Sequence, residues 1–137
     1  MPHRALARVL VAKIALTVLA WCIPLLLFPA SLLETLGFPV PEPRLFLRLL
    51  GVAYTALVVG YWRGLQSTRS GEYPASTVTV GIVSNGGAFG ILCASAWLGT
   101  WSDWGAFAQT IMWGSLAGTG GITAGLVLFG PLRSDSV

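Results

Sequence analysis

Four long apolar stretches that carry almost no charge dominate this sequence. Of its 137 residues, 8 are Lys or Arg and 5 are Asp or Glu, so 9% of the chain is charged, against about 25% in an ordinary soluble domain. A charge at the centre of a membrane helix costs about 2.5–3.5 kcal/mol on insertion scales. The pattern therefore predicts an integral membrane protein, with the lipid bilayer as its first partner.

The apolar stretches predict transmembrane helices over about residues 9–28, 45–62, 77–98 and 104–129. Each has roughly the 20 residues that a helix needs to cross a bilayer, so residues 1–137 form a single integral membrane domain. The short turn before Trp104 makes the last two helices antiparallel neighbours. We expect an all-α membrane protein, an antiparallel four-helix transmembrane bundle. The first stretch resembles a signal peptide but lacks a suitable cleavage site, and we interpret it as the first span.

The basic residues predict the orientation of this bundle. One side holds Arg4, Arg8, Lys13, Arg63, Arg69 and Arg133, and the other holds Arg44 and Arg48. Cytoplasmic loops carry the excess of Lys and Arg, so both termini should be cytoplasmic, in a bacterial inner membrane. The arginines are scattered rather than gathered on one polar face, so no nucleic acid is expected as a partner.

A short helix is expected between the first two spans. Ser31-Leu32-Leu33-Glu34 matches a capping box, with Ser31 as the N-cap and Glu34 three residues later. Gly37 is suited to end this helix in the left-handed conformation. Its leucines give it an apolar side, so it should lie in the outer membrane interface.

Glycines recur at helical spacing in the last two spans. They are Gly86 and Gly90 in the third span, and Gly114, Gly118, Gly121 and Gly125 in the fourth. Such spacing places small residues on one face of a helix, where another helix can approach closely. These helix-packing residues serve either the interior of the bundle or a docking face for another subunit.

Asn85 is the most deeply placed polar residue of the predicted spans. An amide in hydrocarbon needs hydrogen-bond partners, and Thr17, Tyr54, Thr119 and Thr123 are candidates on other spans. One interpretation is an interhelical hydrogen-bond clamp. The alternative is an amide that contacts a ligand or solute in a cavity.

Two basic residues lie about one turn inside the predicted spans. Lys13 should extend back to the cytoplasmic interface. Arg48 should extend to lipid phosphate or pair with Glu34 or Glu42, or else hold an anionic headgroup. Gln109, near the outer end of the fourth span, is a plausible polar neighbour of Arg48.

The residues needed for common membrane chemistry are missing from the sequence. His3 is the only histidine, and the two cysteines, Cys22 and Cys93, do not form a CxxC motif. No Asp or Glu lies within a predicted span, whereas proton-coupled carriers usually need one. We therefore expect no catalytic residues, no cofactor and no metal site, which favours a protein without enzymatic activity over a membrane enzyme.

The layout resembles the DoxX-like group of small four-span bacterial membrane proteins. The resemblance rests on chain length, on four spans, on Arg48-Leu49-Leu50-Gly51 at the start of the second span, and on the leucine-rich segment 31–38 before it. Some members are named as small membrane subunits of quinone-linked oxidoreductases. The resemblance thus implies an accessory or anchoring subunit and transfers no site residue.

Three functional hypotheses follow from these features. The first is a non-catalytic accessory or anchoring subunit of a larger membrane complex, which packs on other subunits or on itself through its glycine-rich faces. The second is a small oligomeric channel or carrier for a neutral or anionic solute, whose path Asn85, Arg48 and Gln109 would line. The third is a membrane protein that binds a lipidic ligand.

Overall fold

The computed structural model describes residues 4–131, and all regular elements within that range are helices. They are α1 (Arg4–Thr17), the π-helical turn η1 (Val18–Cys22), α2 (Ile23–Leu27), α3 (Ala30–Thr35), α4 (Leu45–Ser70), α5 (Ala75–Trp97) and α6 (Ala106–Phe129). The first three follow one another directly and form one long helix. Four helices, 4–27, 45–70, 75–97 and 106–129, are long and apolar enough to cross a membrane. The prediction of four apolar helices that fit an integral membrane protein is confirmed.

The first long helix and α4 extend well beyond their predicted spans. The first begins at Arg4, and α4 continues to Ser70, eight residues past the predicted end, whereas α6 begins at Ala106, two residues after its predicted start. Hydropathy detects where the apolar residues end, but the helical backbone continues through polar residues such as Arg63 and Arg69. Helix α4 ends at Gly71, whose φ of 91° is left-handed, a conformation that favours glycine.

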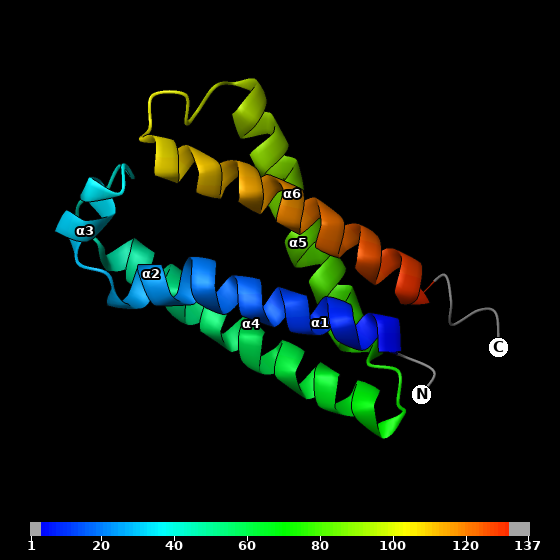
Figure 1. The fold of residues 1–137 in the computed structure, drawn as a ribbon. Coiled ribbons are helices and arrows are strands. Elements are labelled where there is room, and N and C mark those ends of the chain that lie inside the picture. The colour runs from blue at the N-terminus through cyan, green and yellow to red at the C-terminus, as the bar shows by residue number, and fades with distance from the viewer. Residues whose placement is uncertain (1–3, 132–137) are drawn as a thin grey trace.

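The four long helices form two pairs that meet at one end of the molecule and separate at the other (Figure 1). The helix 4–27 packs along α4, and α5 packs against α6. We call the end with the start of α1 and the end of α6 the terminal half. The opposite end, with α3 and the α5–α6 loop, is the loop half.

The buried core lies in the terminal half. It consists of Leu6 and Leu10 of α1, Tyr61 and Leu65 of α4, Val78 of α5, and Ile122 and Leu126 of α6. Glycines allow the helices to approach one another closely in this half. A Cβ atom built on Gly81 would lie 2.7 Å from Cδ1 of Leu126, and one built on Gly64 would collide with the side chain of Thr77. Small residues at crossings let helices pack closely by dispersion, and here they join α4, α5 and α6.

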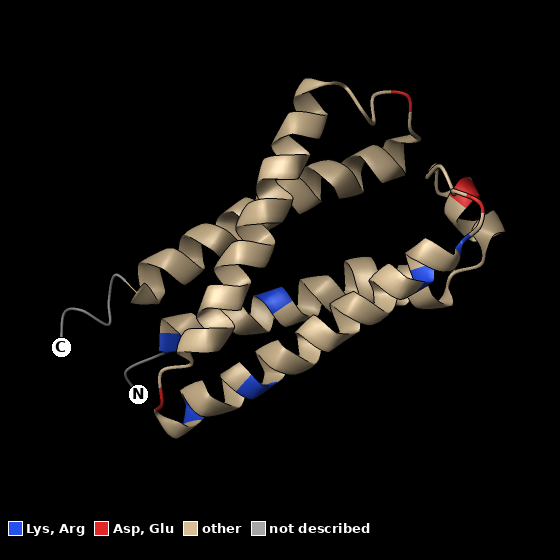
Figure 2. Cartoon of the chain, turned by 180° about the vertical axis from the view of Figure 1, so that it is seen from behind, with Lys and Arg blue, Asp and Glu red and all other residues tan. Residues whose placement is uncertain are grey.

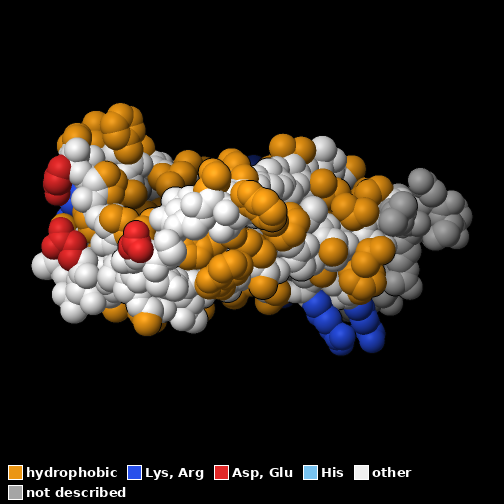
Figure 3. Space-filling model, turned by 90° about the horizontal axis from the view of Figure 1, so that it is seen from above, with side chains coloured by type: hydrophobic (Ala, Val, Ile, Leu, Met, Phe, Trp, Pro, Cys, Tyr) orange, Lys and Arg blue, Asp and Glu red, His pale blue; other side chains and the backbone are white. Residues whose placement is uncertain are grey.

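Charge and apolar surface are distributed as a bilayer requires. Acidic residues of the α3–α4 segment and of the α5–α6 loop lie at the loop half, and Lys and Arg lie mainly towards the terminal half (Figure 2). Apolar side chains cover much of the face seen in Figure 3. Val83 and Ile91 on α5 are each 70% exposed. These residues have no role in the core and are suited to contact with lipid.

The short helix α3 is present, but its predicted capping box is wrong. The helix begins two residues earlier than that box implies, at Ala30, with Pro29 instead of Ser31 as the N-cap and no side-chain cap hydrogen bond. The N–H groups of Leu32 and Leu33 donate to the carbonyl of Pro29. Because the backbone of Pro29 starts the helix, Ser31 lies within its first turn and does not cap it.

The end of α3 follows its prediction. Gly37 has a φ of 85°, and its N–H donates to the carbonyl of Glu34. The N–H of Phe38 donates to the carbonyl of Leu33 over 3.0 Å. This pair of hydrogen bonds is a Schellman motif, and it turns the chain so that Phe38 points back over the bundle.

Candidate binding cavity

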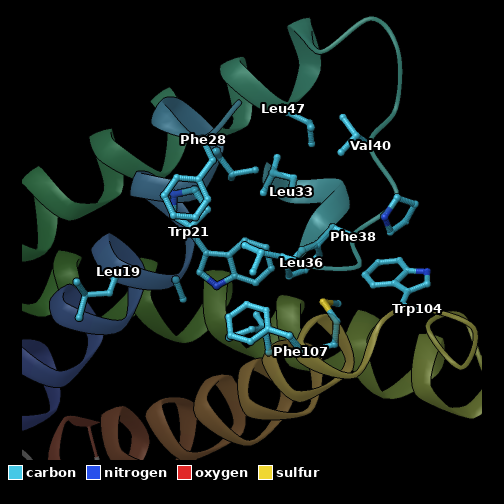
Figure 4. A pocket seen from close by; sticks show the side chains of 16 residues that line it. Leu19, Trp21, Phe28, Leu33, Leu36, Phe38, Val40, Leu47, Trp104 and Phe107 are labelled. Atoms are coloured by element: carbon cyan, nitrogen blue, oxygen red, sulfur yellow. The ribbon is translucent and has the colours of Figure 1, made fainter. Parts of the chain in front are cut away.

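An apolar cavity of about 350 Å³ lies where the two helix pairs separate, in the loop half. Figure 4 shows aromatic side chains from several elements around it: Trp21 of η1, Phe28 after α2, Phe38 after α3, Trp104 and Phe107. Most of the other residues that line it are leucines or other aliphatic residues. A cavity of 300–1,000 Å³ with predominantly apolar walls is typical of a small-molecule site.

Edge-to-face aromatic contacts hold one wall of the apolar cavity. The ring of Phe38 lies 6.1 Å from that of Trp104 and 6.5 Å from that of Phe107, both at steep angles. Such contacts contribute about 0.5–1.5 kcal/mol beyond the burial of area. They connect the segment after α3 to the start of α6.

The same two segments also meet through their backbones at a pair of glycines. The N–H of Gly105 donates to the carbonyl of Gly37 over 3.0 Å. A Cβ built on Gly105 would lie 2.7 Å from the Cα of Gly37, which no side chain can accommodate without a shift of the backbone. We call this contact the glycine latch, because it ties α3 to α6 across the loop half.

Arg44 supports the other side of the apolar cavity. Its Nη2 donates to the carbonyl of Phe28 over 2.6 Å. That carbonyl precedes Pro29, where the chain leaves the first long helix. Arg44 thus fixes the exit of α2 to the start of α4, and it is a structural residue that the sequence did not single out.

A second cavity, of about 330 Å³, adjoins the first and is more polar. It is lined by Lys13 and Thr17 of α1, by Asn85 of α5, and by hydroxyl residues and glycines of α6. Ala20, Trp21 and Ile111 line both cavities. The polar cavity therefore lies between the terminal-half core and the apolar cavity, and the two share a wall.

The π-helical turn η1 carries two of these shared residues, Ala20 and Trp21. The turn ends at Cys22, two residues before Pro24, which lies in the first turn of α2. A π-helical turn inserts one residue into a helix and is frequently found at functional sites. Here it lies beside both cavities, and the ring of Trp21 packs 5.8 Å from that of Tyr54 on α4.

Lys13 does not extend to the interface as predicted. It is only 9% exposed, and its Nζ lies 5.6 Å from the centre of the Tyr61 ring, within the range of a cation–π contact. Within residues 4–131, no carboxylate pairs with it; the acidic residues of that range, Glu34, Glu42, Glu72 and Asp103, lie outside the four long helices. Tyr61 on the neighbouring helix holds the lysine inside the bundle, which hydropathy alone does not reveal.

Asn85 is buried, as its depth suggested, but it has different partners. Its Nδ2 donates to the carbonyl of Gly81 over 2.7 Å and lies 3.4 Å from Oγ of Ser84, both on its own helix. Its Oδ1 is buried and has no hydrogen-bond partner among the described residues. The side chains of Tyr61 and Ser84 instead form a hydrogen bond between α4 and α5, and their hydroxyl oxygens are 2.7 Å apart.

Arg48 and Gln109 are not brought together with Asn85. Arg48 is half-buried near the start of α4. Nε2 of Gln109 donates to the carbonyls of Ser102 and Trp104, over 2.9 and 2.8 Å, and so fastens the α5–α6 loop. Of these three residues, only Asn85 lines one of the cavities described here within residues 4–131.

The glycines of α6 trace how the two helix pairs separate. A Cβ built on Gly125 would lie 3.0 Å from Val9 of α1, one on Gly118 would lie 3.8 Å from Leu16, and one on Gly114 would meet nothing within 4 Å. Gly121 also has open space around it. On α5, Gly86 approaches Thr123 at 3.5 Å, whereas Gly90 meets nothing within 4 Å. Some of the six glycines predicted to pack helices thus lie at contacts between helices of the bundle, and the others face open space.

Comparison with protein-family models, with curated proteins and with solved structures gives no significant match. The resemblance to the DoxX-like group thus remains an expectation from the sequence. The sequence did not predict the apolar cavity, because its walls come from segments that are far apart in the chain. Both cysteines are free thiols, Cys22 buried and Cys93 exposed.

Proposed function

We propose that this protein is an integral membrane protein that binds a lipidic ligand in the apolar cavity between its two helix pairs. The observation that carries the proposal is the cavity itself. It is lined almost wholly by aromatic and aliphatic side chains from the first long helix, from the α3 segment and from α6. A cavity with this lining, inside a protein whose outer surface is also apolar, favours a ligand that partitions into membranes.

The proposal includes the topology inferred from the charges. The four long helices would form an antiparallel transmembrane bundle in a bacterial inner membrane, with the terminal half at the cytoplasmic side. Arg63 and Arg69 near the end of α4 support this orientation, while Glu34, Glu42 and Asp103 belong to the opposite side. Arg133, part of the same argument, lies outside the described residues. The cavity would then lie in the outer half of the membrane.

Filling the cavity tests the proposed function. Ile111 lines both cavities, so Ile111→Trp places an indole in the space that the ligand would occupy. The matched control is Ile91→Trp, at a position on α5 that is 70% exposed. We expect the wild-type protein and the control, purified in mild detergent, to retain a lipid-soluble compound detectable by native mass spectrometry and solvent extraction. Ile111→Trp should lose it.

The size-exclusion profile separates loss of the ligand from loss of the fold, because overpacking also destabilises proteins. If Ile111→Trp remains monodisperse and retains the same compound as the control, the ligand does not occupy this cavity and the proposal fails. If no compound accompanies the wild-type protein even from gently solubilised membranes, the proposal fails as well.

A groove between α4 and α5 favours a second candidate, the accessory subunit. Ala53, Ala56 and Gly60 line it together with Tyr61 and Val80. A Cβ built on Gly60 would meet nothing within 4 Å, and small residues on an open helix face suit close packing of another membrane helix. Gly60→Leu should then reduce the mass of a complex that survives mild detergent on a native gel, whereas Gly87→Leu, also at an open glycine, should not. A wild-type protein that always migrates alone excludes this candidate.

A further inference from the structure

We infer that the polar cavity holds the head of the ligand, and that this head is a carboxylic acid at the end of a long apolar chain. This inference rests on the proposed function and specifies its ligand. It assigns Lys13 as the counter-ion of the head, Thr17 and Asn85 as its polar neighbours, and the apolar cavity as the site of the chain.

Lys13 carries most of the argument. Lys13 is nine-tenths buried as a residue, and a lysine ammonium group withdrawn from water costs free energy unless it is paired. In the described part of the chain its contact is with the face of the Tyr61 ring, which offsets only part of that cost. An anionic oxygen that enters the polar cavity would supply the missing partner. A carboxylate is the smallest lipid head with that charge and has two acceptor oxygens.

Thr17 and Asn85 add hydrogen-bonding capacity of both kinds. Thr17 is 2% exposed and lines the same cavity one turn beyond Lys13, where its hydroxyl is a donor for a carboxylate oxygen. Oδ1 of Asn85 is a buried acceptor without a partner in the described residues. It can accept from the lysine ammonium once that group turns towards the head, or from the O–H of a protonated acid. Leaving such a buried acceptor unpaired costs free energy, which a ligand that donates a hydrogen bond to it would recover.

The position of the polar cavity indicates the shape of the ligand. Three residues line both cavities, so the cavities are adjacent, and a molecule with its head at Lys13 would enter the apolar cavity at this shared boundary, between Trp21 and Ile111. Along the first long helix, Lys13 is separated by about 20 Å of helical rise from Phe28, which lines the apolar cavity. This path favours a single long chain over a two-chain phospholipid. The other strong candidate for the head, Arg48, does not line either cavity.

Quenching of tryptophan fluorescence by brominated lipids tests this assignment. The purified protein in phosphatidylcholine nanodiscs is titrated with a long-chain fatty acid brominated near mid-chain, and with its methyl ester. Trp21→Phe identifies the part of the signal that comes from the shared wall. We expect the wild-type protein to bind the acid at least tenfold more tightly than the ester, the effect of one hydrogen bond to a charged group.

Two variants remove polar groups from the site, and a third variant, at Arg48, serves as the matched control. Lys13→Met should abolish the preference for the acid while leaving the affinity for the ester unchanged. Thr17→Val keeps the shape of the side chain and should reduce the preference a few-fold. Arg48→Gln should leave it unchanged.

The outcomes separate this inference from the proposed function. If acid and ester quench Trp21 with equal affinity, or if Lys13→Met preserves the preference, the head assignment is wrong although the cavity still binds lipid. A preference that disappears in Arg48→Gln instead moves the head to α4 and also overturns it. If neither compound quenches Trp21 in any variant, the proposed function fails together with this inference.

Discussion

The terminal half and the loop half are built from the same four long helices but are packed in opposite ways. In the terminal half, Leu10 and Leu126 are completely buried, and glycines such as Gly81 bring the helices into contact. In the loop half, bulky aromatic side chains surround an open cavity instead.

The difference shows how a small membrane protein can keep a cavity open. Lipid chains are as apolar as leucine, so the hydrophobic effect does not drive membrane helices together, and close contact between them has to stabilise the fold. The terminal half supplies this contact through leucines and small residues. The loop half needs only the glycine latch, the aromatic contacts of Phe38 and the Arg44 hydrogen bond to hold its shape. Close packing and the apolar cavity are thus separated along the length of the same helices.

The contrast between the two halves requires the terminal half to contribute most of the free energy of unfolding. Leu126 of α6 is fully buried, whereas Leu128, two residues later, is 56% exposed. Leu126→Ala should lower the free energy of unfolding by about 2–5 kcal/mol, as for other buried leucines. Leu128→Ala should change it by less than about 0.5 kcal/mol, as at ordinary surface positions.

Reversible unfolding by dodecyl sulfate in mixed micelles measures both values. Similar losses for Leu126→Ala and Leu128→Ala would mean that the buried cluster does not stabilise the protein more than its lipid-facing surface does.

The sequence predicts a feature of the two halves best when that feature depends only on neighbouring residues. The four apolar helices and the left-handed Gly37 were predicted correctly, because hydropathy and turn chemistry act within a few residues. The capping box at Ser31 failed because the N-cap of the helix is Pro29, two residues earlier. The end of α4 was placed eight residues too early, although Gly71 was a visible stop signal.

The candidate site depends on contacts between helices, and these were mostly missed. The sequence indicated that Lys13 and Asn85 were unusual, but not that both would line one cavity. The position of Lys13 is decided by Tyr61, which comes from α4, 48 positions later in the printed sequence. The apolar cavity requires Phe38 to fold back onto α6, which in turn depends on the contact between Gly37 and Gly105. No periodicity within one segment encodes such a contact.

The glycine latch offers a test confined to the loop half. Gly105 is the N-cap of α6, a position where serine is at least as favourable as glycine. Gly105→Ser therefore keeps the cap but adds a Cβ against the Cα of Gly37. Overpacking of this kind costs about 1–3 kcal/mol. We expect faster amide hydrogen exchange over residues 30–38, measured by mass spectrometry, with little change in α1 and α4.

The control for the latch is Gly114→Ser, a substitution on the same helix where an added Cβ meets nothing within 4 Å. It should leave exchange over residues 30–38 unchanged. If Gly105→Ser also left that exchange unchanged, or accelerated it equally in the terminal half, the two halves would not behave as separate structural units.

The smallest expected effect concerns the hydrogen bond between Tyr61 and Ser84, which joins α4 to α5 beside the polar cavity. Tyr61→Phe, Ser84→Ala and the double variant form a double-mutant cycle, whose coupling energy isolates this one interaction. Hydrogen bonds between membrane helices average about 0.6 kcal/mol and reach about 1.7 kcal/mol, so the coupling energy should fall within that range. Unfolding in mixed micelles measures the coupling energy on the same scale as the loss of stability in Leu126→Ala.

A coupling energy above the Leu126→Ala effect would mean that polar bonding, rather than close packing around small residues, holds the helices of the terminal half together. A coupling energy within the expected range leaves close packing by dispersion as the main cause of closure in the terminal half.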